Sequence, residues 1–251
     1  MALPSAELIA FFLALVRAAA WILMVPPFNN QSIPMITKVG LAGGLALVVS
    51  KSLAAGPLPS STGSFIGSIV MQVVIGAALG FMVQILFSAI SAAGSLTDML
   101  GGIVLPPSLD PLSENQTPLI GQLYNLVAMI LLFVSGADLI LVDGFLRSFS
   151  VLGTSIASLA NIAHLLTSGV ATLFLAALEI AAPVLICLFA TQVVLGLAAK
   201  AAPQLNVFMF GFPLQILIAL VLVAISIATI PAFFTHIIED ALRQTSRMLG
   251  G

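Results

Sequence analysis

Two long apolar runs, at residues 65–97 and 205–238, contain no aspartate, glutamate, lysine or arginine. A helix that crosses the hydrocarbon core of a bilayer needs only about 20 mostly apolar residues, since that core is about 30 Å thick. At a rise of about 1.5 Å per residue, each run would reach about 50 Å as a single helix. We therefore expect either that the runs bend, which Gly94, Pro213 and Pro231 permit, or that much of their surface faces protein instead of lipid.

Charged residues are scarce along the whole chain. They make up 6% of its 251 residues, whereas 61% are hydrophobic, and soluble domains carry about 25% charged residues. Four more apolar runs lie at residues 8–25, 39–55, 119–137 and 165–199. Lipid tolerates only helices or closed barrels, and the alternating pattern of barrel strands is absent from the sequence. The sequence predicts an all-α integral membrane protein with about six hydrophobic helical segments, several of them bent or hairpin-like.

Glycines separated by three residues form three pairs in the first third of the chain: Gly40 and Gly44, Gly63 and Gly67, and Gly76 and Gly80. Such spacing lets the backbones of neighbouring helices approach closely within a membrane. Together the three pairs predict a tightly packed helical assembly.

The segment TDMLGGIVLPPSLDPLSENQTP, at residues 97–118, interrupts the apolar runs. Its two glycines and four prolines prevent a continuous helix. The segment is nevertheless apolar, because it contains Ile103, Val104, Leu105, Leu109 and Leu112. Non-helical backbone at membrane depth persists only where protein covers it or where it lines an aqueous cavity. Two interpretations stay open: an extracytoplasmic loop packed on its own helices, or an element that lines a cavity.

Residues 143–169 show a different pattern. Apolar residues recur at alternating steps of four and three, at Phe145, Phe149, Leu152, Ile156, Leu159, Ala163 and Leu166. This spacing predicts an amphipathic helix with one apolar stripe. Its other face carries little positive charge, unlike the face of a helix that lies on a lipid surface. We expect this helix to pack against other protein helices.

Two charged residues, Arg17 and Glu179, lie within apolar runs. A charge at that depth is costly, and it marks either a paired structural contact or a functional site. A proton carrier would show several acidic residues along its spans, which this chain does not. We therefore favour an ion pair, either between Arg17 and Glu179 or with a partner subunit, over a proton or substrate relay.

Motifs of known catalytic or metal sites are absent from the sequence. It contains no HExxH, no paired cysteines, no GxSxG and no Walker loop, and it has one cysteine and two distant histidines. It also lacks a basic tract for nucleic acid. We predict that the chain is not an enzyme and binds no cofactor and no metal.

Four stretches carry a resemblance to a known family. PQLNVFMFGFPLQ, at residues 203–215, follows AAPVLICLFATQVVLGLAAK, at residues 181–200. Together they resemble the signature of the FliR family of flagellar export proteins, called SctT in virulence type III secretion. GAALGFMVQILFSAISAAGSLTDMLGG, at residues 76–102, and LDP, at residues 109–111, also resemble the family's pattern. The resemblance covers almost the whole chain, as one membrane domain at residues 1–251.

Individual residues can be carried over from that resemblance. The family motif corresponds here to Lys200, Pro203, Gln204, Leu205, Asn206, Gly211, Phe212 and Pro213. The resemblance implies a bend at this motif, where amide side chains satisfy freed backbone groups. Three residues depart from the family pattern: Gln72 stands where an acidic residue is common, Gln215 stands where a basic one is common, and Ala137 follows Gly136 where Gly-His is frequent.

The resemblance also implies a function, that of a structural and gating subunit of the export gate that passes unfolded proteins across the bacterial inner membrane. It implies a helical pore shared with FliP-like and FliQ-like membrane subunits, contact with FlhB-like and FlhA-like export proteins, and a location at the flagellar basal body. Residues 97–118 would then plug the pore, through Ile103, Val104, Leu105, Pro106, Pro107, Leu109, Asp110, Pro111 and Leu112. The alternative is a secondary transporter of a small solute, which would bind at Arg17, Glu179 and the broken segments.

Overall fold

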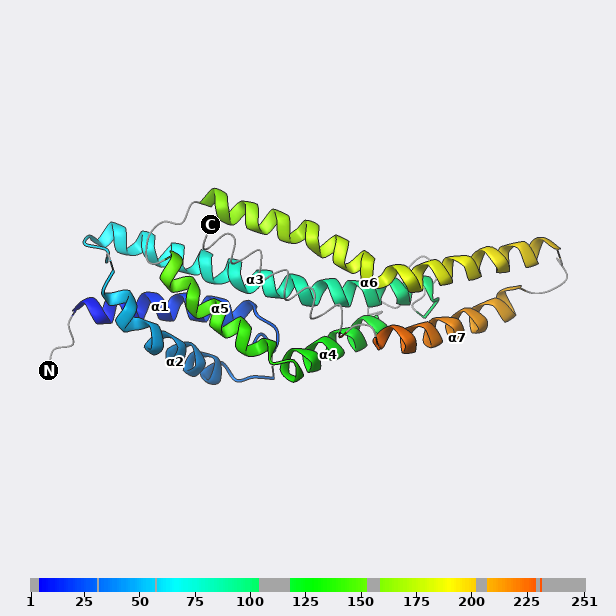
Figure 1. Ribbon diagram of the computed structural model, residues 1–251, viewed down its shortest axis with the longest axis horizontal. Coiled ribbons are helices and arrows are strands. Elements are labelled where there is room, and N and C mark those ends of the chain that lie inside the picture. The colour runs from blue at the N-terminus through cyan, green and yellow to red at the C-terminus, as the bar shows by residue number, and fades with distance from the viewer. Residues whose placement is uncertain are drawn as a thin grey trace. The chain divides into compact units, whose positions relative to one another are not determined.

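The computed structural model describes residues 5–30, 32–56, 58–103, 118–152, 159–201, 207–228 and 231. These residues form helices and short connections, and no strand occurs among them. The helices, drawn in Figure 1, are α1 (Ser5–Met24), α2 (Met35–Ala54), α3 (Thr62–Leu100), α4 (Leu119–Val134), α5 (Ala137–Leu152), α6 (Leu159–Ala201) and α7 (Val207–Ile227). The prediction of an all-α protein is confirmed.

The uncharged run at residues 65–97 lies within a single helix. α3 extends over 39 residues without interruption, and α6 extends over 43 residues with Pro183 inside it. The run at 65–97 is therefore not a hairpin, and of the two ways to place an overlong run, contact with protein along much of its surface is the one that remains. The stripe predicted at 143–169 is divided between α5 and the start of α6, and residues 153–158 lie outside the described part, so a continuous helix there stays a prediction.

Four of the described helices are long and apolar enough to cross a membrane: Ala6–Met24, Met35–Ala54, Thr62–Leu100 and Gly169–Ala201. α4 and α5 make a fifth candidate if they are counted as one broken span, interrupted near Gly136. That glycine has a φ of +71°, a conformation that side chains with a Cβ rarely adopt. The chain is thus a multi-pass membrane protein by length and composition of its helices.

The chain divides into two compact units. The first contains α1, α2, α5, the part of α3 up to Leu86 and the start of α6 up to Ala171. The second contains the rest of α3 from Phe87, α4, α7 and α6 from Thr172.

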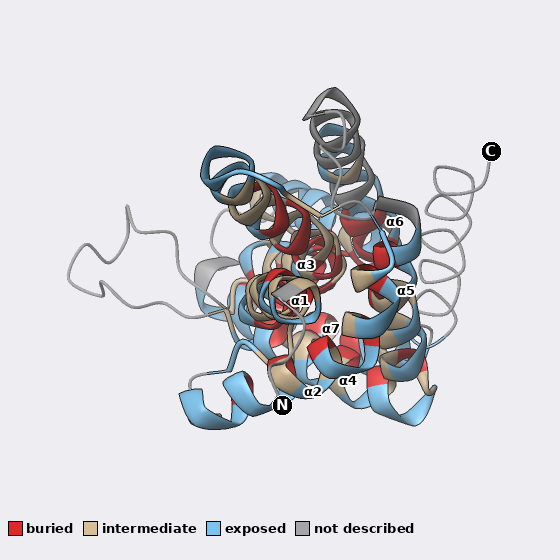
Figure 2. Ribbon diagram, turned by 90° about the vertical axis from the view of Figure 1, so that its left-hand side faces the viewer, coloured by how far each residue is buried: buried red, intermediate tan, exposed pale blue. Residues whose placement is uncertain are grey.

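In the first unit, α1 is covered by α2, α3 and α5 (Figures 1 and 2). Its buried residues recur at steps of three and four, at Ala10, Leu13, Ala14, Arg17, Ala18, Trp21 and Ile22. This spacing places them on one broad stripe of the helix. Trp21 stacks on Phe145 of α5 with ring centroids 4.5 Å apart, and Phe145 meets Phe149 edge-on at 5.3 Å. The predicted apolar stripe of α5 therefore packs against protein at these two rings.

One glycine pair brings two helix backbones together. A Cβ at Gly80 of α3 would lie 2.6 Å from the Cβ of Met24 and 3.0 Å from the carbonyl oxygen of Trp21. A Cβ at Gly76 would meet the carbonyl oxygen of Arg17 and lie 3.0 Å from the Cβ of Ala20. Both glycines are needed because only hydrogen fits between α1 and α3. The predicted close approach is confirmed for this pair.

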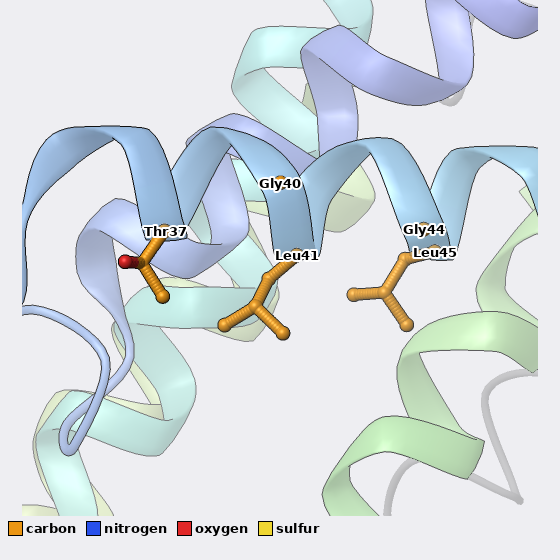
Figure 3. A pocket seen from close by; sticks show the side chains of 5 residues that line it. All are labelled: Thr37, Gly40, Leu41, Gly44 and Leu45. Carbon is orange, nitrogen blue, oxygen red and sulfur yellow. The ribbon is translucent and has the colours of Figure 1, made fainter.

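The other two glycine pairs lie open. Within the described part of the chain, no atom comes within 4 Å of a Cβ built at Gly40, Gly44, Gly63 or Gly67. On α2 the first pair lines a shallow hollow together with Thr37, Leu41 and Leu45, whose side chains extend to one side of the helix (Figure 3). This face of α2 is not used for packing within the described chain.

Two small apolar clusters lie among the described residues of the second unit. Ala89 of α3 packs with Ala176 and Ala177 of α6, where small side chains let the helices approach. Further along, Val184 and Leu188 of α6 pack with Ala219 of α7. A hydrogen bond between the buried hydroxyls of Tyr124 and Ser226 joins α4 to α7.

Candidate functional site

The candidate site is the base of the apolar segment that follows α3. This base consists of the end of α3, the start of α4 and the side chains of α6 and α7 that bond to the end of α3. α3 ends in a turn whose amides donate hydrogen bonds to carbonyl oxygens of the last helical turn. The amide of Ile103 donates to the carbonyl oxygen of Asp98 at 3.1 Å. Gly102, which directly precedes Ile103, has a φ of +69°. This is the six-to-one bond and left-handed residue of a Schellman cap. The cap turns the chain sharply out of α3.

The side chain of Asp98 reaches the start of the next helix. Its carboxylate accepts the amide of Ile120 at 3.0 Å and 2.8 Å on its two oxygens, and the amide of Gly121 at 3.0 Å. The first amides of a helix have no acceptor within the helix, and the carboxylate supplies one at the positive end of the helix dipole. Asp98 is 1% exposed, so this pairing is desolvated and stabilises the start of α4.

Backbone contact between α3 and α4 explains two glycines nearby. A Cβ at Gly94 would lie 2.7 Å from the Cα and nitrogen of Gly121, and one at Gly121 would lie 2.6 Å from the Oγ of Ser95. The two helices thus cross with only hydrogen between them, which brings the Ile120 and Gly121 amides within reach of Asp98.

The last carbonyl of α3 is held by two other helices. The Nε2 of Gln192 on α6 donates to the carbonyl oxygen of Leu100 at 3.3 Å, and the Nε2 of Gln215 on α7 donates to the same oxygen. α7 also covers the turn, because Ala219 lies against Gly101 and the ring of Phe212 lies 3.4 Å from a Cβ built at Gly102. The end of α3 is therefore fixed by side chains of α6 and α7.

Of the predicted plug residues, Ile103 is described. It is half-buried and packs against the cluster of Val184, Leu188 and Ala219. The others lie outside the described residues, and their predicted role stays a prediction: Val104, Leu105, Pro106, Pro107, Leu109, Asp110, Pro111 and Leu112.

The family motif is described in part. Lys200 lies exposed near the end of α6, whereas residues 203–206, which include Pro203, Gln204, Leu205 and Asn206, lie outside the described part. Gly211 is buried, and Phe212 and Pro213 are exposed, all three within α7. Residues 207–213 of the motif are helical, and the bend that the resemblance implies at this motif stays a prediction. A proline removes a single intrahelical bond, and membrane helices tolerate this where neighbouring groups compensate.

Arg17 forms a second polar cluster, in the first unit. Its guanidinium is fully buried, and its Nε donates to the Oε1 of Gln72 at 2.5 Å. Its Nη1 donates to the carbonyl oxygen of Ser148 at 3.1 Å, and its Cζ lies 4.2 Å above the ring of Phe149. α1, α3 and α5 thus meet around one cation. Glu179 belongs to the second unit and is exposed, so its pairing with Arg17 stays a prediction.

Comparison with known proteins decides the family. Residues 8–241 match the family described as "Bacterial export proteins, family 1". The chain belongs to this family. The flagellar biosynthetic protein FliR of Escherichia coli (strain K12) is 29% identical over 231 residues, which is 92% of this chain and 88% of that protein. FliR of Bacillus subtilis (strain 168) is 27% identical over 88% of this chain and 87% of that protein.

A relative from a secretion system is also similar to this export protein. The secretion system apparatus protein SsaT of Salmonella typhimurium (strain LT2) is 28% identical over 65% of this chain and 64% of that protein. The match of the family over nearly the whole chain agrees with the resemblance carried by residues 76–102 and 181–215.

The polar side chains of these two sites are suited to holding helices and helix ends in place. Asp98, Gln192 and Gln215 bond to backbone groups, and Arg17 donates to Gln72 of α3 and to the carbonyl oxygen of Ser148 of α5. Within the part of the chain that the structure describes, no three metal-ligating side chains gather. Asp98 and Gln192 were not predicted as site residues, whereas Gln215 was expected both to depart from the family pattern and, as an amide of the motif at 203–215, to bond to a freed backbone group. A usable signal was the position of Asp98, which is the first charge after the uncharged run at 65–97.

Proposed function

We propose that this chain is a structural and gating subunit of a type III export gate, the membrane complex that passes unfolded proteins across the inner membrane. The observation that carries the proposal is the family match over residues 8–241, with flagellar relatives aligned over about nine-tenths of the chain. The flagellar relatives align over more of the chain than SsaT does. We therefore place the subunit at the flagellar basal body of the bacterial inner membrane.

The partners in this proposal are FliP-like and FliQ-like membrane subunits that form the pore with this chain, together with FlhB-like and FlhA-like export proteins. The open glycine faces support a hetero-oligomer, because membrane helices use such faces to pack. The exposed apolar side chains of α6 support it too, including Phe174, Leu175, Ile186 and Phe189.

Gating is assigned to the segment after α3. Ile103, Val104, Leu105, Leu109 and Leu112 offer an apolar surface that excludes water and ions. Burial of each such side chain contributes roughly 1.5–3 kcal/mol at most, so partial burial of a few favours closure and still lets an arriving substrate open the pore. Both flanks of this segment are anchored, α3 through the carbonyl of Leu100 and α4 through the bond from Gly121 to Asp98, which suits an element that must return to one place.

The alternative, a secondary transporter of a small solute, finds no support in the site. Arg17 was its first candidate ligand, and this side chain is fully buried among α1, α3 and α5. A solute would have to separate those helices to reach it. Energy for export would come from other subunits, as the sequence offers no nucleotide-binding motif.

Two experiments together test the proposal. Tagged chain is expressed with the FliP-like and FliQ-like subunits of the same bacterium, extracted in mild detergent and imaged. The gene is then deleted, and export of flagellar proteins into the medium is measured. We expect one complex that contains all three subunits, and an export defect that the plasmid-borne gene repairs. A chain that purifies free of both subunits, in a deletion strain that still exports normally, contradicts the proposal.

A further inference from the structure

Lys38 is a buried cation at the start of α2. It is 9% exposed, and it is the one buried residue among residues 34–40. Within the part of the chain that the structure describes, its ammonium group makes no hydrogen bond and no ion pair, and Asp143 of the same unit pairs with Arg147 instead. A desolvated cation without a counter-charge is costly. This lysine therefore needs an anion from outside the described chain.

The first turn of α2 adds unsatisfied donors. Pro34 is the N-cap residue and makes no side-chain cap bond, and no acidic residue lies in the first turn. The amide of Thr37 donates to the carbonyl oxygen of Pro34 at 3.0 Å, whereas the amides of Met35 and Ile36 have no acceptor among the described residues. Such amides, at the positive end of the helix dipole, are a binding site for an anion.

The side chain of Lys38 extends toward these amides. In an α-helix the Cα–Cβ bond tilts toward the amino end, so that a long side chain covers the turn that precedes its own residue. Lys38 follows Met35 by one turn of α2, and its side chain therefore runs back along the first turn. The ammonium group and the two amides create a positive potential at the same place.

This place lies at the end of a candidate membrane span. α2 begins at Met35, after a polar stretch that contains Asn29, Asn30 and Ser32. The end of a span lies near the boundary between the hydrocarbon and the headgroups of the bilayer. Met35 and Ile36 are 60% and 82% exposed. Their amides are thus open to the bilayer, and their side chains offer an apolar surface to acyl chains.

We infer that the start of α2 binds one anionic phospholipid. The phosphate group accepts hydrogen bonds from the amides of Met35 and Ile36, and the charge of Lys38 attracts it from the buried side of the helix. The acyl chains lie along the exposed side chains of Met35, Ile36 and Val39. These apolar side chains favour a lipid over a free phosphate ion. The inference goes beyond the proposed function, since it concerns a ligand and not export.

The test is a lipid titration followed by native mass spectrometry. The complex with its FliP-like and FliQ-like subunits is purified, stripped of lipid in detergent, and titrated with phosphatidylglycerol or with zwitterionic phosphatidylcholine. A third titration adds inorganic phosphate to the complex that holds phosphatidylglycerol. If the chain purifies without those subunits, it is titrated alone, so that a failure of the proposed function does not prevent the test.

Two variants attack the site independently. Lys38→Gln removes the charge. Met35→Pro removes one amide at the first helical position, where proline is favoured, and the ψ of 142° at Pro34 is the conformation that a residue before proline requires. Lys51→Gln is the matched control, because Lys51 is exposed on the same helix and lies about 20 Å from Lys38 at the helical rise per residue, beyond the range of screened charges.

We expect the first phosphatidylglycerol to bind the wild type at least about fivefold more tightly than phosphatidylcholine, which is the contribution of one lysine near an anionic lipid surface. Lys38→Gln should remove most of this preference. Met35→Pro should weaken the binding of phosphatidylglycerol about fivefold or more, through loss of a bond to a charged group. Lys51→Gln should change it less than about twofold.

The inference fails if the wild type shows no preference for phosphatidylglycerol, if Lys38→Gln binds it as the wild type does, or if Lys51→Gln weakens it equally. Displacement of the lipid by inorganic phosphate would assign the site to the free ion and overturn the lipid assignment. If Lys38→Gln loses its subunits, Met35→Pro decides. Wild-type binding of phosphatidylglycerol by Met35→Pro then assigns the lysine to a carboxylate of a partner subunit and overturns the inference, whereas weaker binding in the intact complex supports the lipid site.

Discussion

The Nε of Arg17 donates to the Oε1 of Gln72 at 2.5 Å, between α1 and α3 of the first unit. A buried guanidinium needs every acceptor that the surrounding helices offer, because a desolvated charge with an unsatisfied donor is costly. Gln72 therefore contributes to stability through Arg17, and two substitutions at this position have different expected effects.

Gln72→Met keeps the length of the side chain and removes the acceptor, so the assembled complex should lose about 1.5–3 kcal/mol of stability. Gln72→Glu adds a negative charge beside the cation and should equal or exceed the wild type. The measurement is the half-life of the purified complex at an elevated temperature, because unfolding of such assemblies is irreversible. Equal half-lives for Gln72→Met and wild type would mean that the hydrogen bond from Arg17 to Gln72 does not stabilise the complex.

Gly76 and Gly40 belong to pairs with the same spacing but different surroundings. Gly76→Ala places a methyl group against the carbonyl oxygen of Arg17, so α1 and α3 must separate. Overpacking of this kind costs about 1–3 kcal/mol, and the amount of chain that accumulates in membranes should fall. Both variants are expressed without the partner subunits, so that Gly40→Ala is a matched control whose methyl group meets no atom of the described chain. Equal accumulation of the two variants contradicts the assignment of Gly76 to the helix contact.

The isolated chain is expected to be unstable without its partners. α3 and α6 are longer than a bilayer requires, and both expose apolar side chains, such as Ile66 and Phe189. Size-exclusion chromatography of the chain in detergent should give aggregates, and coexpression with the FliP-like and FliQ-like subunits should give one sharp peak. A monodisperse isolated chain that unfolds cooperatively contradicts this expectation.

Glu179 is exposed on α6, a helix with an apolar surface. A carboxylate at such depth needs a partner, and we expect another subunit to supply it. Glu179→Gln should therefore reduce the yield of copurified complex more than the export per assembled complex. Complex yield is measured by quantitative blotting and export by secreted substrate. Unchanged yield with lost export would instead assign Glu179 to a proton or substrate role.

Hydropathy predicted the helices but not their contacts. α1 and α3 follow directly from the apolar runs, and the buried state of Arg17 follows from its place inside one of them. The sequence also predicted the close approach at Gly76 and Gly80. It could not tell this pair from Gly40 and Gly44, since both have the same spacing and only the neighbouring helix distinguishes them.

The base of the segment was less accessible to sequence reasoning. Asp98 bonds to residues 22 and 23 positions away, and Gln192 and Gln215 reach Leu100 from two other helices. Such contacts depend on how α3, α4, α6 and α7 pack, which no local pattern encodes. Pro213 lies inside α7, as the apolar run at 205–238 allowed, because a membrane helix tolerates a proline where neighbouring groups compensate for the lost bond.

The central claim is that this chain both builds and closes an export pore, and ion conductance of the assembled complex tests it most directly. Leu105→Ser with Leu109→Ser replaces two apolar side chains of the proposed plug with hydroxyl groups that water solvates. The variant complex should assemble in normal amounts, yet conduct ions well above the wild-type level in a planar bilayer. A normally assembled variant with wild-type conductance would contradict the account and leave the segment with a packing role alone.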